Sequence, residues 1–62
     1  MLTVDRQDRI TYVMSHWKRG IVGVATKINR HKWHTEDYET GEQIVAATLT
    51  KARFWLERPK QS

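Results

Sequence analysis

The chain has 62 residues, no cysteine, and eleven Lys and Arg against seven Asp and Glu, which gives a net charge of +4. A chain of this length has room for one hydrophobic core, so we expect a single domain over residues 1–62. The lack of cysteine excludes disulfides and thiolate metal sites, and no apolar run approaches the roughly 20 residues that span a bilayer. We therefore expect a cytoplasmic protein without a membrane partner.

Residues 9–38 follow a predicted N-terminal arm, residues 1–8, and are typical of a sheet. Two segments rich in β-branched and aromatic residues, 9–17 and 21–28, flank Lys18-Arg19-Gly20, and a three-residue loop with a left-handed Gly is a common hairpin connection. Residues 32–38 would add a third short strand. The predicted inner face of the hairpin consists of Ile10, Tyr12, Met14, Val22, Val24 and Ile28.

The same region also fits helices, which would make the whole chain an all-α three-helix domain. Ile10, Val13, Met14 and Trp17 form a helical stripe, and Gly20 would end that helix. Gly23 and the many Val, Ile and Thr residues around it lower the helix propensity of the second segment. We therefore favour the sheet.

Residues 40–57 fit an amphipathic helix. Thr40 and Gln43 have the spacing of a capping box, and apolar residues then recur at intervals of three and four. Pro59 biases Arg58 away from helical geometry, so the helix should end near Glu57 and leave residues 58–62 as a tail. The predicted fold is α+β, with an N-terminal antiparallel hairpin or three-stranded sheet packed on one long C-terminal helix.

This order of elements, with Tyr38-Glu39-Thr40 leading into Ala46-Ala47, resembles that of integrase arm-binding domains and of plant DNA-binding domains with a three-stranded sheet. Those domains place the sheet in the major groove, so the resemblance over residues 9–57 implies DNA as a partner. The glycines and the Arg/Trp strand pattern of those families are missing here. The resemblance therefore assigns no residue roles.

The sequence contains no catalytic set and only a weak metal-binding pattern. Ser15 and His16 are adjacent, so in a strand their side chains point to opposite faces and cannot act as a dyad. His31 and His34 have a spacing that occurs in metal sites, but no thiolate accompanies them. We expect a protein that is not an enzyme and has neither a cofactor nor a bound metal.

Basic and aromatic residues alternate in Asn29-Arg30-His31-Lys32-Trp33-His34, and more cations lie at Lys27 and at the hairpin tip. Cations neutralise phosphates, an exposed Trp stacks on bases, and Asn reads base edges. We therefore predict a small nucleic-acid-binding protein. Its predicted binding residues are Lys18, Arg19, Lys27, Asn29, Arg30, Lys32 and Trp33, with Arg19, Lys27, Arg30 and Lys32 on phosphates and Trp33 as a stacking residue.

The alternative hypothesis is a small protein-binding inhibitor or adaptor of the kind found in phages and mobile elements, with an acidic protein partner. Small size, the lack of a catalytic set, and the aromatic residues Trp17, Trp33 and Phe54 motivate this alternative. An exposed Phe54 would also allow a homodimer.

Overall fold

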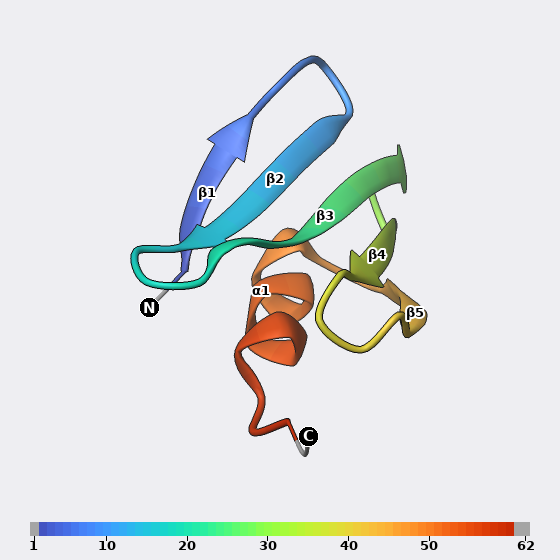
Figure 1. Cartoon of the computed structure of the whole chain (residues 1–62). Coiled ribbons are helices and arrows are strands. Elements are labelled where there is room, and N and C mark those ends of the chain that lie inside the picture. Colours follow the sequence, from blue (N-terminus) through green and yellow to red (C-terminus); the bar gives the residue numbers. More distant parts are fainter. Residues whose placement is uncertain (1, 61–62) are drawn as a thin grey trace.

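The structure, a computed structural model, describes residues 2–60 and consists of five antiparallel strands followed by one helix (Figure 1). The elements are β1 (Thr3–Arg6), β2 (Thr11–His16), β3 (Gly20–Asn29), β4 (Lys32–Asp37), β5 (Gln43–Ala46) and α1 (Leu49–Glu57). The strands lie side by side in chain order, so each one pairs with the next. The predicted α+β class is confirmed, and the all-α alternative is wrong.

The predicted hairpin forms between β2 and β3, and the predicted third strand is β4. Gly20 ends the turn with a φ of 76°, a left-handed conformation that glycine adopts without steric cost. The N-terminal arm was predicted wrongly, because residues 3–6 form the edge strand β1 and pair with β2. Leu2 is buried, and its amide donates to Glu57 Oε1 at 2.8 Å, which ties the start of the chain to the end of α1.

A β-bulge changes which residues of β3 face the core. The register shifts where Ser15 pairs with Ile21, so Val22 and Gly23 both lie on the helix side. Val24 consequently pairs with Val13 on the open face, and Ile28 is 58 % exposed. The predicted inner face therefore holds for Tyr12, Met14 and Val22, but it is wrong for Val24, Ile28 and the half-exposed Ile10.

The helix is shorter than predicted and begins later. Residues 43–46 form β5, in which Ile44 and Ala46 face the core, and β4 pairs with it. The N-cap is Thr48, whose Oγ1 accepts from the Lys51 amide at 3.1 Å, whereas Thr40 Oγ1 accepts from Glu42 in a turn. The spacing of apolar residues in this segment is compatible with a strand as well as with a helix. The helix starts at the second cap, Thr48.

One face of the sheet packs against α1, and the other is open to solvent (Figure 1). Gly23 makes this contact close: a Cβ there would clash with the Glu36 carbonyl oxygen and lie 2.8 Å from Leu56 Cδ2. Ala52 and Leu56 are the fully buried residues of the helix. The buried apolar core consists of Leu2, Met14, Val22, Ala25, Trp33, Ala46, Ala52 and Leu56.

Arg58 and Lys60 do not behave as the predicted tail, because both make ion pairs with the buried carboxylate of Asp37. Gln61 and Ser62 lie outside the described residues. Within residues 2–60, no helix has the length and apolar character needed to cross a membrane.

Candidate nucleic-acid interface

The strand order sends the turns of the sheet alternately to two ends of the molecule. The β1–β2 loop, the β3–β4 turn and the first turn of α1 lie at one end, which we call the basic end (residues 6–10, 27–32 and 48–51). The β2–β3 turn, the β4–β5 turn and the end of α1 lie at the other, which we call the ion-paired end (residues 17–19, 37–42 and 57–60). The sheet therefore separates segments that are close in sequence.

The net positive charge of the protein is concentrated at the basic end. This end carries six Lys and Arg and one Asp, for a net charge of +5, whereas the ion-paired end carries four cations and four carboxylates. The first turn of α1 contains no acidic residue, so the partial positive charge of the helix N-terminus adds to this field. The cations of the basic end are Arg6, Arg9, Lys27, Arg30, Lys32 and Lys51.

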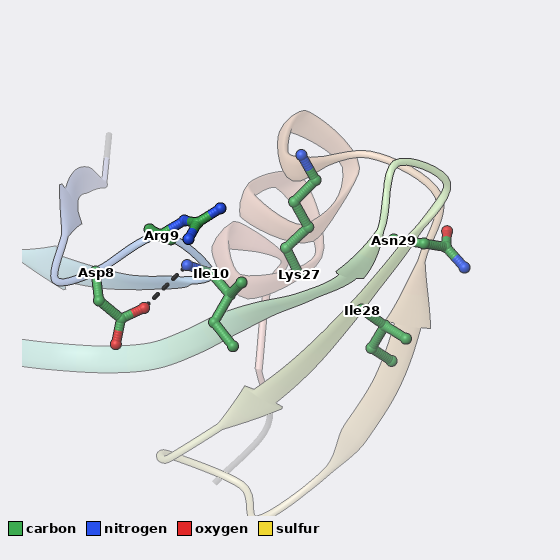
Figure 2. Close-up of a pocket in the computed structure, with 6 residues that line it drawn as sticks. All are labelled: Asp8, Arg9, Ile10, Lys27, Ile28 and Asn29. Atoms are coloured by element: carbon green, nitrogen blue, oxygen red, sulfur yellow. Dashed lines mark hydrogen bonds between the residues drawn. The ribbon is translucent and has the colours of Figure 1, made fainter.

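The β1–β2 loop and the end of β3 are held together and line a shallow, open pocket of about 620 Å³ (Figure 2). The Lys27 amide donates to the Ile10 carbonyl at 2.7 Å, which continues the β2–β3 pairing into the loop. Asp8 shapes this loop, because its Oδ1 accepts from the amides of Ile10 and Thr11 at 2.9 and 2.8 Å. The hydrogen bonds from these two amides lower the pKa of the Asp8 carboxyl, because they stabilise its charged form within the loop.

The side chains of this pocket divide into two groups. In Figure 2, Arg9 and Lys27 extend to one side of the paired segments, and Ile10 and Ile28 extend to the other. Ile10 is 49 % exposed and Ile28 is 58 % exposed. Cations and apolar side chains thus lie next to each other on the same exposed end.

Trp33 does not reach solvent as the sequence suggested. It is 8 % exposed and packs edge-on against Tyr12, with a distance of 5.2 Å between the ring centroids. Lys27 Nζ lies 5.8 Å from the Trp33 ring, and the Arg6 guanidinium lies 5.9 Å from the Tyr12 ring. Trp33 is therefore not exposed for stacking on a base; its ring instead lies beside Lys27, and the Tyr12 ring lies beside Arg6.

Asn29 is partly committed to the local turn. Its Oδ1 accepts from the His31 amide at 2.8 Å, which uses one of the two lone pairs of this oxygen and leaves Nδ2 as a donor. Arg30 and Lys32 are exposed on either side of His31. The turn therefore presents donors and positive charges.

Lys18 and Arg19 belong to the ion-paired end, so the structure does not bring them together with the other predicted binding residues. Arg19 Nη1 lies 3.2 Å from Glu39 Oε1 and bridges the β2–β3 and β4–β5 turns. Lys18 lies beside Trp17, at 5.4 Å from the centroid of its ring. Trp17 is 81 % exposed at the tip of this turn.

Asp37 organises the ion-paired end from a fully buried position. Its Oδ2 lies 3.0 Å from both Arg58 Nη1 and Lys60 Nζ, and its Oδ1 accepts from the Glu39 amide at 2.8 Å. Burial raises the pKa of this carboxyl. The hydrogen bonds from Lys60, Glu39 and Arg58 outweigh that effect, so the pKa lies below its ordinary value of 3.8.

Sequence reasoning missed Arg6, Arg9, Ile10, Ile28 and Lys51 as members of the basic end. Arg6 and Arg9 were assigned to an arm and a strand start, and Lys51 to the middle of a helix. Only the strand order shows that these segments share one end with residues 27–32. Within residues 2–60, no three His, Asp or Glu side chains lie close enough together to hold a metal ion.

Comparison of the chain with protein-family models, with curated proteins and with solved structures finds no match. The geometry and charge of the two ends are therefore the features from which its function can be inferred.

Proposed function

We propose that this protein binds nucleic acid through its basic end and has no enzymatic role. The observation that carries the proposal is the net charge of +5 that the fold gathers at one end from three separate segments. Clustered Lys and Arg bind phosphates by releasing condensed counterions. We assign phosphate contacts to Arg9, Lys27, Arg30 and Lys32, and we withdraw the assignment of Lys18 and Arg19.

Exposure supports this choice of residues. Arg9, Lys27, Arg30 and Lys32 are all exposed, and none of them forms an ion pair with the carboxylates of residues 2–60. Arg19, Arg58 and Lys60 are each paired with carboxylates at the other end. Binding a phosphate at the basic end therefore breaks no internal ion pair.

The test is a fluorescence anisotropy titration of a short labelled nucleic acid at about 50 mM and about 200 mM salt. With about four phosphate contacts, affinity should fall roughly 100-fold across this range. Arg30→Ala and Lys32→Ala should each weaken binding and reduce the logarithmic salt slope by about one. Affinity that is absent at low salt, or that does not change with salt, would contradict the proposal.

Lys18→Ala is the matched control for Lys32→Ala, because both lysines are exposed and lie in or next to a turn of the sheet, but Lys18 lies at the ion-paired end. We expect its affinity and salt slope to equal those of the wild type. If Lys18→Ala weakens binding as much as Lys32→Ala, the interface has been placed at the wrong end.

A second candidate function is protein binding through the β2–β3 turn, which the 81 % exposure of Trp17 favours. Exposed Trp side chains are common anchors in protein interfaces. The corresponding experiment is capture of a defined acidic protein, which should survive nuclease treatment and be lost in Trp17→Ala. Capture that nuclease abolishes would instead assign the interaction to nucleic acid.

A further inference from the structure

We infer that the nucleic acid is duplex DNA and that Ile10 and Ile28 enter its minor groove as an apolar wedge between base pairs. This inference rests on the proposed function and adds the substrate and the mode of contact. Proteins that bind the minor groove insert apolar side chains such as Ile, Leu or Phe between base steps while flanking cations hold the phosphates. The basic end has both components.

The two isoleucines are placed as one unit. The hydrogen bond from the Lys27 amide to the Ile10 carbonyl fixes the loop against the end of β3. Both side chains line the same open pocket and extend away from Arg9 and Lys27 (Figure 2). Two half-exposed isoleucines on a tip that is otherwise rich in charge leave apolar surface in water, and insertion between bases would bury that surface.

The exposed aromatic side chains argue against a single strand. Proteins that bind single strands without sequence preference stack successive bases on aromatic rings. Among residues 2–60, the exposed aromatics are Trp17 and Tyr38 in turns of the ion-paired end and Phe54 on α1, while Trp33 is buried. The basic end thus offers aliphatic side chains, which suit a wedge, and no exposed Phe, Tyr or Trp ring.

The cations and Asn29 fit the minor groove. Arg9 precedes Ile10 in the β1–β2 loop, and Arg30 and Lys32 follow Ile28 in and after the β3–β4 turn, so exposed cations neighbour each isoleucine along the chain. The Asn29 side chain keeps its Nδ2 donor, and the minor groove of A·T pairs presents only acceptors. We therefore expect a preference for A·T-rich duplexes over G·C-rich ones.

Acidic residues limit the footprint on the open face. Asp5, Val13, Val24 and Glu36 are paired across the four strands in one row. The next row toward the basic end holds Thr11, Thr26 and His34 and contains no carboxylate. The acidic row repels phosphates. The DNA should therefore contact the basic end and the row of Thr11, Thr26 and His34, but not the acidic row.

The test is a short duplex DNA that carries a donor and an acceptor fluorophore at its two ends. Wedge insertion kinks DNA, so saturating wild-type protein should change the transfer efficiency. The double variant Ile10→Ala, Ile28→Ala should bind roughly tenfold or more weakly, lose the change in transfer efficiency, and keep the wild-type salt slope because every cation remains. Ile21→Ala is the matched control, because Ile21 is also 58 % exposed but lies at the start of β3 near the other end.

The outcomes separate this inference from the proposed function. Wild-type protein that binds the duplex without any change in transfer efficiency, or a double variant that bends DNA like the wild type, would overturn the wedge and leave nucleic-acid binding intact. Binding to single-stranded DNA or to an RNA duplex that is tighter than binding to the DNA duplex, measured by anisotropy titration, would also overturn the wedge alone. Failure of the wild type to bind any of these nucleic acids at low salt would overturn both.

Discussion

At the ion-paired end, eight charged side chains cancel one another and connect three segments, whereas at the basic end seven charged side chains leave a net charge of +5. The first arrangement stabilises the fold, because carboxylates and cations satisfy each other around the buried Asp37. The second costs some self-repulsion, and none of its cations forms an ion pair with a carboxylate of residues 2–60. Charge that is left uncompensated in this way is available to a partner.

The largest expected effect on stability is that of Asp37→Asn. The variant keeps an oxygen for the Glu39 amide but leaves Arg58 and Lys60 without the charge that they surround. We expect a loss of about 3 kcal/mol in the free energy of unfolding, measured by urea denaturation. At a temperature at which the variant is fully folded, its affinity for DNA should stay within about twofold of wild type, because the basic end is unchanged.

Glu42→Gln is the control for Asp37→Asn, because Glu42 also pairs with Arg58 but its side chain is 63 % exposed. An exposed pair contributes little, so its loss should cost about 0.5 kcal/mol or less. Equal losses in the two variants would show that the burial of Asp37 does not matter.

Acid should weaken the ion-paired end through Asp37. Because the pKa of Asp37 is lower in the folded protein than its ordinary value of 3.8, this carboxylate contributes stability above that pH. The contribution is lost as the pH falls through the folded pKa. Denaturation curves of the wild type should therefore lose stability below about pH 4, and the Asp37→Asn variant should lose less over the same interval. Identical pH profiles would refute this role of Asp37.

The sequence predicted the elements whose local signals agree with the tertiary structure. Lys18-Arg19-Gly20 gives the β2–β3 turn because only a left-handed residue closes such a loop easily, and Gly20 has that conformation. Residues 32–37 alternate between buried and exposed positions and form β4 as expected. The end of α1 before Pro59 was also predicted from local chemistry.

The start of α1 and the faces of β3 depend on long-range pairing that no local pattern encodes. Residues 43–46 become a strand because β4 offers a free edge, and Val24 turns outward because a bulge adds one residue to β3. The predicted binding residues were divided between the two ends for the same reason. Lys18 and Arg19 are close in sequence to Lys27 and Arg30, but alternate turns of an antiparallel sheet lie at opposite ends.

A smaller effect is expected at Arg19, which the sequence assigned to the interface. Arg19→Ala removes a surface ion pair with Glu39 in which the two side chains are 44 % and 28 % exposed. The free energy of unfolding should change by about 0.5 kcal/mol or less, and DNA affinity should stay within about twofold of wild type. A tenfold loss of affinity in an anisotropy titration would return Arg19 to the interface and remove the contrast between the ends.

The smallest effect is expected at Glu36, in the acidic row that borders the basic end. Glu36 forms no ion pair with the cations of residues 2–60, so Glu36→Gln should leave stability within about 0.5 kcal/mol of wild type. It also removes a negative charge from the row next to the proposed contact surface, which should tighten DNA binding about twofold at low salt. This gain in affinity should vanish at high salt, because salt screens the repulsion between Glu36 and the phosphates. A Glu36→Gln variant that binds more weakly would show that the acidic row contacts the DNA as an acceptor, and the footprint would then cover the open face beyond the basic end.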